Sequence, residues 1–289
     1  MKRVVIIPTI RQENDITYTY NAVAEFLKFG AEVYMEPAFC NLKLQSEIIF
    51  TEVDSIYENC DLIVVLGGDG SILRAAQHAL KYDKPLLGIN LGRIGYMAEL
   101  EKDELSYISN IYNGSYTTEK RMTLSVGVQK GDGSFKTLGT ALNDVVIERG
   151  SYSQCADLTL FADHKNVRAF RADGLIIATP TGSTAYSMAA GGSVLDPTIE
   201  CICATPICPI SRYDCPIVFS GNSVLEIKHN DERAKGLGIS VDGESLHCLT
   251  IGEVLVVQRS EQSVNMLSVK DEGFFETLNN KISQYELKS

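Results

Sequence analysis

The sequence lacks any apolar run near the roughly 18 residues that a membrane-spanning helix needs. Residues 1–8 place two positive charges before a short apolar run that ends at Pro8. That run is too short for the core of a signal peptide. We therefore expect residues 4–7 to form a buried first strand, and we expect a cytoplasmic protein with no membrane partner.

The chain also has few positive charges, with 26 Lys and Arg residues and 37 Asp and Glu residues. The formal net charge of −11 repels a polyphosphate backbone, so we expect no nucleic-acid partner. A small phosphate ligand would need local help from backbone N–H groups, an arginine or a metal ion.

Several motifs of nucleotide and metal chemistry are missing. No Gly-Lys dipeptide occurs, which excludes a P-loop. No His-Arg-Asp or Asp-Phe-Gly sequence occurs, which argues against a protein kinase. No His-Glu-x-x-His helix occurs either, and the four histidines match no catalytic pattern.

The eight cysteines do not resemble the disulfide framework of a small secreted protein. Four of them crowd into residues 201–215, but their spacing is not that of paired C-x₂-C zinc ligands. We interpret them as reduced, partly buried thiols in a reducing cytosol, and we expect no protein-bound metal centre.

The first third of the chain alternates strand and helix patterns, which predicts a doubly wound parallel α/β domain over residues 1–120. In the expected helix 15–29, the predicted inner face holds Tyr20, Val23, Ala24 and Leu27. The other expected elements are strands at 33–35, 62–66 and 85–89 and a helix at 71–82, in which Ser71 or the preceding glycines provide the N-cap.

The sequence pattern changes near residue 120, where many short runs typical of β-strands replace the helical patterns. They predict an all-β, sandwich-like domain over residues 121–269, with a hairpin at Gly131-Asp132-Gly133. A final helix is expected at 274–282, with residues 270–289 packing back on the first domain. The expected strands are 124–128, 135–138, 144–147, 158–161, 167–170, 175–178, 217–219, 224–227, 238–241 and 254–257.

The strongest local feature is Gly67-Gly68-Asp69-Gly70-Ser71, which lies between an apolar strand and a helix. Ligands of open α/β sheets bind at this end of a strand. Glycines allow close backbone approach and a helix N-terminus favours negative charge, so the loop suits phosphate. A carboxylate is repulsive there unless it binds a metal or removes a proton, and both roles belong to phosphoryl transfer. The structural alternative is a turn in which Asp69 only caps the helix.

Two further segments offer polar groups for a small ligand. Residues 173–192 run from an apolar strand into small and hydroxyl residues, which provide close approach, donors and acceptors, and Tyr186 adds a flat face. Asn143-Asp144 stands before another apolar run and could hold ribose hydroxyls or an adenine amine. Each segment also has a structural interpretation, as a flexible loop and as a common turn.

Together these residues resemble the NAD kinase family, also called ATP-NAD kinases. Family members carry a Gly-Gly-Asp-Gly loop, an Asn-Glu or Asn-Asp pair, and an Asp-Gly strand that runs into Thr-Gly-Ser-Thr-Ala-Tyr. All three occur here in that order, at residues 67–70, 143–144 and 173–186. Residues 91–96 resemble the family's Gly-x-Leu-Gly-Phe region, with Tyr96 where phenylalanine is usual. The Gly-Gly-Asp-Gly loop alone is shared with diacylglycerol kinases and phosphofructokinases.

The resemblance implies an enzyme that moves the γ-phosphate of ATP to the 2′-hydroxyl of the adenosine ribose of NAD. It also implies an α/β domain, a β domain, a cleft between them and a homodimer or homotetramer. Asp69 would be the general base, and Mg²⁺ or another divalent cation would accompany ATP.

The resemblance also assigns binding roles. Phosphates would meet the glycine loop and Arg74, and the adenosine half of NAD would meet Asn143-Asp144. Asp173 would contact the nicotinamide side. Arg171, two residues before Asp173, is a second cationic candidate after Arg74. The full set of expected binding residues is Gly68, Gly70, Arg74, Tyr96, Asn143, Asp144, Arg171, Asp173, Thr181, Thr184, Ala185, Tyr186, Ser187 and Ala189.

The sequence departs from the family's pattern at two places, and two alternative functions remain. Residues 208–210 read Cys-Pro-Ile where the family often has Pro-His, and residues 242–244 read Asp-Gly-Glu near the family's Asp-Gly-Gln. A diacylglycerol-type lipid kinase shares the glycine loop, but it should show a basic or apolar membrane-facing patch. A non-catalytic NAD(P)-binding module would gain nothing from Asp69 beside phosphates.

Overall fold

The computed structural model describes residues 1–42, 44, 46–92, 95–150, 155–231 and 236–286. The chain divides into two compact units, Met1–Lys120 with Val264–Ser289, and Arg121–Ser263. The second unit ends six residues before the expected boundary at 269, because strand β18 (Val254–Ser268) begins in one unit and ends in the other. No helix in the described part of the chain is long and apolar enough to span a bilayer.

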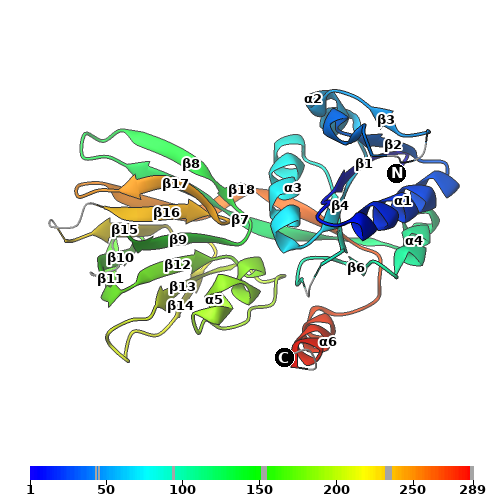
Figure 1. Ribbon diagram of the computed structural model, residues 1–289. Coiled ribbons are helices and arrows are strands. Elements are labelled where there is room, and N and C mark those ends of the chain that lie inside the picture. Colours follow the sequence, from blue (N-terminus) through cyan, green and yellow to red (C-terminus); the bar gives the residue numbers. More distant parts are fainter. Residues whose placement is uncertain (43, 45, 93–94, 151–154, 232–235, 287–289) are drawn as a thin grey trace. The chain divides into compact units, whose positions relative to one another are not determined.

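The first unit is built on a parallel sheet with the strand order β3-β2-β1-β4-β5. Helices cover both faces, with α1 and α4 on one side and α3 on the other (Figure 1). The prediction of a doubly wound α/β domain is therefore confirmed. The elements are β1 (Arg3–Pro8), α1 (Glu13–Lys28), β2 (Glu32–Met35), η1 (Pro37–Phe39), β3 (Ile49–Phe50), α2 (Val53–Asn59), β4 (Leu62–Gly67), α3 (Asp69–Tyr82), β5 (Leu86–Asn90), β6 (Leu100–Glu101), η2 (Leu105–Tyr107), α4 (Ile108–Asn113) and α6 (Phe274–Glu286).

The order of the strands places a topological switch point between β1 and β4. From β1 the chain moves outward to β2 and β3, and it then returns to β4 on the other side of β1 before reaching β5. The two strands run in register, so that Pro8 lies opposite Leu66 near their carboxyl ends. Open α/β sheets bind ligands in the crevice outside such a pair of strand ends.

In the two long helices, α3 and α1, the spacing of apolar residues predicts the buried residues with different success. In α3 the apolar residues at helical spacing, Ile72, Ala75, Ala76, Ala79 and Leu80, are all buried. The helix starts at Asp69 with Gly68 as its N-cap, so Ser71 lies inside the first turn.

The predicted inner face of α1 is confirmed only in part. Val23 is fully buried and Leu27 packs against the core, but Tyr20 is 47% exposed, and the buried face also holds Thr19, Ala22 and Phe26. The hydroxyl of Thr19 donates to the carbonyl oxygen of Asp15 at 2.7 Å, which makes this polar side chain compatible with burial. A count of apolar residues alone cannot recognise such a position.

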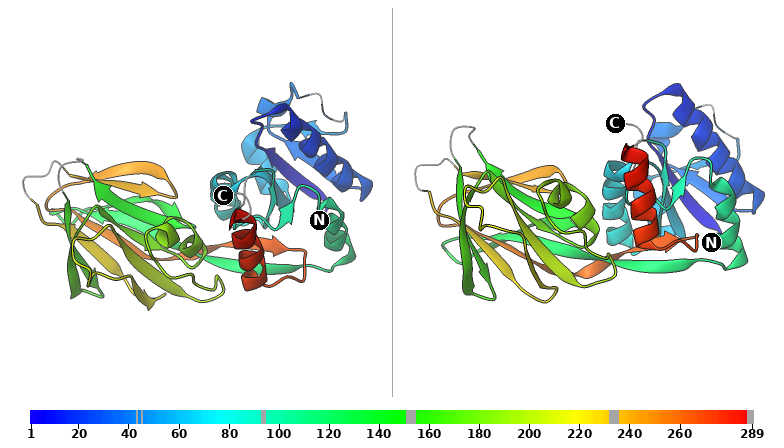
Figure 2. Two further views of the ribbon diagram at one scale, coloured as in Figure 1. Left: turned by 60° about the horizontal axis from the view of Figure 1, so that its bottom comes forward. Right: turned by 90° about the horizontal axis from the view of Figure 1, so that it is seen from below.

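The second unit is a sandwich of two antiparallel sheets (Figure 2). One sheet has the order β14-β13-β12-β9-β16-β17, and the other contains β11-β10-β15-β18 together with the β7-β8 hairpin. A shared core joins the two sheets, with Leu158 and Ile227 from one and Ile147 and Ile177 from the other. The elements are β7 (Thr117–Gln129), β8 (Phe135–Ala141), β9 (Asp144–Arg149), β10 (Ala156–Ala162), β11 (Lys165–Ala172), β12 (Gly174–Ala178), η3 (Thr181–Thr184), α5 (Tyr186–Ala189), β13 (Cys201–Ile207), β14 (Ile217–Ser220), β15 (Leu225–His229), β16 (Leu237–Val241) and β17 (Glu244–Leu249).

The crowded cysteines belong partly to a strand that the sequence did not predict. Strand β13 is buried along its whole length, and it carries Cys201 and Cys203 as free thiols. Cys208 and Cys215 lie beyond the strand and are exposed. Among the described residues, no group of three or more His, Cys, Asp and Glu side chains could hold a metal ion.

Candidate active site

Asp69 is held rigidly at the N-terminus of α3. Its carboxylate accepts hydrogen bonds from the backbone N–H groups of Tyr96 (2.8 Å) and Met97 (3.2 Å). Gly95 allows this approach, because a Cβ atom there would lie 2.5 Å from Oδ1 of Asp69. Tyr96, an expected binding residue, therefore contributes its backbone N–H to the carboxylate. The result is a carboxylate whose orientation is fixed by main-chain atoms.

The segment that carries these N–H groups is itself anchored to β5. The side-chain oxygen of Asn90 accepts the N–H of Gly92 at 3.0 Å, and its amide donates to Glu101 at 2.9 Å. The chain is thereby tied at both ends of the stretch between β5 and β6. Residues 93–94, at the centre of the expected Gly-x-Leu-Gly-Phe resemblance, lie outside the described residues.

A cavity of about 400 Å³ opens beside the first turns of α3, between the carboxyl end of β1 and residues of α2 and of the segment after β2. Thr9, directly after β1, donates its hydroxyl to Ser71 at 2.7 Å, and Arg74 donates to the same hydroxyl at 3.2 Å. Tyr57 and His78 also line this cavity, and their rings stack with centroids 4.3 Å apart. The volume lies in the range of about 300–1,000 Å³ that is typical of small-molecule sites.

The loop glycines leave their backbone accessible. A Cβ atom added to Gly68 or Gly70 would meet nothing within 4 Å. The structure thus brings Asp69, the expected phosphate-binding glycines and Arg74 together around one helix N-terminus, where an anion is favoured.

In the second unit, Asn143 and Asp144 lie at the start of β9 and are held by Asp242 from the turn between β16 and β17. The Asp242 carboxylate accepts the backbone N–H groups of Leu142 (2.8 Å), Asn143 (2.8 Å) and Asp144 (3.1 Å). Its own N–H donates to the carbonyl oxygen of Asp144 at 3.0 Å. Asp242 is a supporting residue that the sequence interpretation noted only as part of a motif.

Burial dominates the electrostatics of this pair of carboxyl groups. It raises the pKa of Asp144 to about 7, and the nearby Asp242 carboxylate adds to the effect. Burial also raises the pKa of Asp242 above its ordinary value, although its three N–H donors oppose the shift. A carboxyl group that can be protonated near neutrality can donate as well as accept hydrogen bonds.

The hydroxyl-rich segment packs directly against this pair. The hydroxyl of Thr179 donates to the carbonyl oxygen of Leu142 at 2.6 Å, and Gly182 lies so close to Asn143 that a Cβ atom would overlap its backbone. In the described part of the chain, Oδ1 of Asn143 and Oγ1 of Thr181 are buried without a hydrogen-bond partner. Buried polar atoms are normally paired, so these two orphaned acceptors mark a place for a polar ligand.

The remaining expected residues of this segment differ in their surroundings. Thr184 donates to the carbonyl oxygen of Thr181 at 3.3 Å, and Ser187 is fully buried and bonds the Thr205 hydroxyl at 2.9 Å. Ser187 thus fixes the segment in place rather than facing solvent. The Tyr186 ring is 44% exposed and free to stack, and Ala185 and Ala189 border it along α5.

Arg171 and Asp173 have different ionic partners. Asp173 pairs with Arg149 at 2.9 Å, whereas Arg171 is near Asp157 at 3.9 Å. The sequence interpretation missed Arg149. It lies at the end of β9, which pairs with β12 so that Glu148 is opposite Gly174, and knowledge of that pairing would have found it.

Models of known families match both halves of the chain. The ATP-NAD kinase N-terminal domain matches residues 5–116, and the ATP-NAD kinase C-terminal domain matches residues 142–269. Together they cover far more than half of the sequence. The chain belongs to the NAD kinase family.

Relatives of similar length support this family membership. NAD kinases from Thermoanaerobacter sp. and Caldanaerobacter subterraneus are 35% and 36% identical, each over 98% of this chain and 100% of the relative. The crystal structure of an NAD kinase from Archaeoglobus fulgidus in complex with ATP aligns with a TM-score of 0.70 at 26% identity, covering 98% of this chain and 99% of that one. Yeast NADH kinase complexed with NADH shares the fold, with a TM-score of 0.87 at 23% identity over 98% and 88% of the two chains.

The matched family ranges contain the candidate site. The N-terminal match includes Asp69 and its glycine loop, and the C-terminal match begins at Leu142, directly before Asn143-Asp144. A lipid kinase and a non-catalytic binding module find no support in these matches.

Proposed function

We propose that this member of the NAD kinase family transfers the γ-phosphate of ATP to the 2′-hydroxyl of the adenosine ribose of NAD, giving NADP. The observation that carries the proposal is the Asp69 carboxylate, which two backbone N–H groups orient at a helix N-terminus suited to phosphate. Pure binding of an anion gains nothing from a carboxylate there, whereas phosphoryl transfer to an alcohol needs a proton acceptor.

Asp69 acts as the general base in this proposal. Its carboxylate accepts the proton of the 2′-hydroxyl while that oxygen attacks the γ-phosphorus of ATP, and the bond from phosphorus to the β,γ-bridging oxygen breaks. The N–H groups of Tyr96 and Met97 keep the carboxylate at a fixed orientation, so little reorganisation is needed when the proton moves.

NAD is bound by the second unit. The orphaned acceptors of Asn143 and Thr181, together with the Asp144 carboxyl, receive ribose hydroxyls and the adenine amine. The exposed ring of Tyr186 stacks on the adenine. Arg149 neutralises Asp173, which leaves that carboxylate oriented for the nicotinamide amide.

ATP is bound by the first unit, with its phosphates on Gly68, Gly70 and Arg74 and its nucleoside part in the adjoining cavity. A divalent cation enters as part of the Mg·ATP substrate, because Mg²⁺ in kinase sites is held by phosphate oxygens, waters and one or two carboxylates. Asp69 is the carboxylate on this loop that can supply such an oxygen. When bound, the cation offsets the charge of the triphosphate.

The test is a coupled assay in which purified protein receives NAD, ATP and Mg²⁺, and an NADP-specific dehydrogenase reports product. We expect Asp69→Asn to lower kcat by about 10²–10⁴-fold, the effect of losing a general base, while the Kd for NAD measured by calorimetry changes little. Asp83→Asn, an exposed change at the other end of α3, is the matched control and should keep wild-type turnover.

The outcomes separate the alternatives. Near-normal turnover of Asp69→Asn would remove Asp69 from the mechanism. A wild-type protein that binds NAD without making NADP would point to another phosphoryl donor or to a binding role. A protein that neither binds nor phosphorylates NAD would contradict the proposed substrate.

The cellular context and assembly are part of the same proposal. The eight free cysteines suit a reducing compartment, which supports a cytoplasmic protein. By family resemblance we propose a homodimer or homotetramer. Light scattering at micromolar protein concentration tests this, and the mass of a single chain would contradict it.

A further inference from the structure

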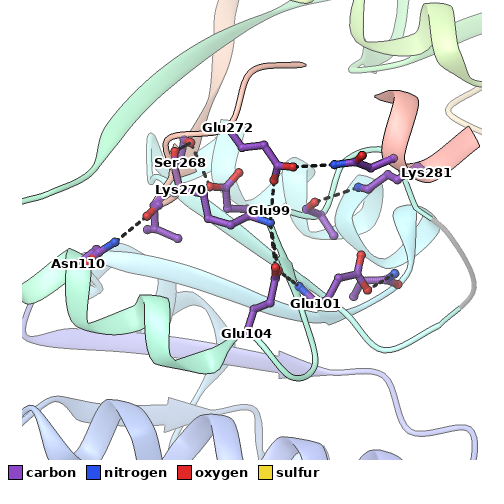
Figure 3. A network of polar contacts seen from close by, with 12 residues as sticks. Glu99, Glu101, Glu104, Asn110, Ser268, Lys270, Glu272 and Lys281 are labelled. Carbon is purple, nitrogen blue, oxygen red and sulfur yellow. Dashed lines mark hydrogen bonds and ion pairs between the residues drawn. The ribbon is translucent and has the colours of Figure 1, made fainter. Parts of the chain in front are cut away.

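The C-terminal helix α6 carries a lysine that the proposed chemistry does not use. Lys281 is only 7% exposed, and its ammonium makes one hydrogen bond, to the carbonyl oxygen of Ala98 at 3.3 Å (Figure 3). No carboxylate in the described part of the chain lies within ion-pair distance of it. Burying an ammonium that has no ion-pair partner is costly, so its position calls for an explanation.

The acceptor of this hydrogen bond, Ala98, directly follows the two residues whose N–H groups bind the Asp69 carboxylate. Tyr96 and Met97 donate to the carboxylate, and Ala98 follows directly in the chain. The 95–98 segment is therefore bound to the Asp69 carboxylate through its N–H groups and to Lys281 through its last carbonyl. Burial lowers the pKa of Lys281, and the charges of Glu101 and then of Asp69 oppose this shift.

A wider network shows that the tail of the chain is built onto this stretch (Figure 3). The Glu99 carboxylate accepts the N–H groups of Val269 (2.7 Å) and Lys270 (2.9 Å). Lys270 in turn pairs with Glu104 at 3.0 Å. These bonds tie the chain before α6 to the residues that follow Ala98, so that α6 delivers Lys281 to a defined place.

The groups around Lys281 do not suggest that this lysine binds a ligand. A cavity of about 110 Å³ beside it is lined by Lys270 and Lys281 and by four glutamates, so carboxylates outnumber ammonium groups and an anionic ligand is disfavoured. The glutamates are Glu99, Glu101, Glu104 and Glu272. Glu101 is already occupied by the side-chain amide of Asn90 at 2.9 Å. What the ammonium holds is a main-chain carbonyl, and that carbonyl belongs to the segment that orients Asp69.

We infer that Lys281 is a positioning residue for the reaction, which fixes the 95–98 segment and through it the orientation of the Asp69 carboxylate. The inference rests on the proposed function of Asp69 as the base. It assigns the C-terminal helix a part in turnover, although α6 contributes no group to the proposed reacting atoms.

The test begins with Lys281→Met, which keeps the stem and removes the ammonium. We expect kcat to fall about 10- to 100-fold, as for a small misplacement of a catalytic group, with the KM for NAD within about threefold of wild type. The midpoint of thermal unfolding should not fall, because replacing a buried charge that lacks an ion-pair partner by an apolar group is often neutral or stabilising. Asn279→Ala, an exposed change on the same helix, is the control and should leave kcat unchanged.

Two further measurements make the inference specific. Hydrogen exchange of the Tyr96 and Met97 amides should be at least about fivefold faster in Lys281→Met than in wild type or Asn279→Ala. In the Asp69→Asn background, adding Lys281→Met should lower kcat no further, because a residue that acts through Asp69 has nothing left to position. Lys281→Arg keeps a charged donor and should retain most of the activity and the protection.

Several results would overturn the inference. They are wild-type kcat in Lys281→Met, unchanged amide exchange, or a full additional loss in the Asp69→Asn background. A Lys281→Met variant that melts well below wild type would assign the lysine to folding instead. If the wild-type protein makes no NADP, the proposed function fails, and the amide exchange still decides whether Lys281 holds the segment.

Discussion

Asp144 carries a carboxyl group whose pKa is raised to about 7 by burial and by Asp242. In the unfolded chain the same group titrates near its ordinary value, so the unfolded state loses its proton first as the pH rises. The free energy of unfolding therefore falls between about pH 4 and pH 7 through this residue, and above that it changes no further. Keeping this carboxyl buried costs stability at neutral pH, as is common for functional groups.

We expect Asp144→Asn to be more stable than wild type above pH 7, by up to about 4 kcal/mol, because an amide cannot ionise. The difference should shrink towards zero near pH 4, where the wild-type carboxyl is protonated in both states. Urea titrations at pH 4.5, 6 and 8 measure it. A stability difference that does not depend on pH would contradict the assignment.

Asp132→Asn is the matched control in the same unit. Hydrogen bonds from Ser134 lower the pKa of the exposed Asp132 carboxyl, so this group stabilises the fold above its unfolded pKa. That contribution is lost as the pH falls through the folded value. The change to asparagine should therefore act in the direction opposite to Asp144→Asn at neutral pH.

The site residues that the sequence singles out are those that belong to a local motif, and their roles stay predictions. Asp69 and Asn143-Asp144 lie at strand ends that their own neighbours define; backbone N–H groups orient Asp69, and Asn143 and Asp144 are buried. Arg149 and Lys281 escaped prediction, because each acts through a partner that only strand pairing or helix docking brings near. Arg171 was named as a cationic candidate because it lies two residues before Asp173 in the chain.

Among elements, β4 and α3 were predictable because a wholly apolar run and a regular helical stripe are unambiguous patterns. Strand β13 was missed, since cysteines and Pro206 interrupt its apolar pattern although it is buried throughout. Strand β17 was missed because it is largely exposed at the edge of its sheet and its apolar alternation is limited to Leu246 and Cys248. In both cases the neighbouring strands, rather than local preference, determine the structure.

The start of β9 depends on the turn between β16 and β17, which supplies Asp242. We expect Asp242→Ala to weaken NAD binding at least about tenfold, because three backbone N–H groups lose their acceptor and Asn143-Asp144 loses its fixed orientation. The midpoint of thermal unfolding should also fall. Calorimetric titration with NAD and a melting curve measure the two effects.

The comparison for this element is Asp132→Ala, which removes a turn carboxylate from the hairpin between β7 and β8. It should leave the Kd for NAD unchanged. Equal losses of NAD affinity in the two variants would mean that general weakening of the unit, rather than the support of β9, is responsible.

At the scale of the whole molecule, the division into an α/β unit and a β unit could be predicted because short strand-like runs replace helical patterns near residue 120. The second boundary was harder to place, because β18 contributes to both units and its pattern continues across residues 263–264. Net charge is a further property of the whole chain that the sequence fixes without any structure.

That charge sets an expectation for the salt dependence of turnover. Both substrates are anionic and the protein carries a formal charge of −11, so long-range repulsion opposes their approach at low ionic strength. Raising KCl from about 0.01 M to about 0.1 M shortens the Debye length from about 30 Å to about 10 Å, which screens the distant charges more than the short contacts at Arg74 and the glycine loop. We expect kcat/KM for ATP to rise about two- to fivefold, and more than for NAD, because ATP carries more charge.

Choline chloride at matched ionic strength should give the same rise if screening is the cause. A fall in kcat/KM would instead show that the local positive groups around Asp69 outweigh the net charge of the molecule.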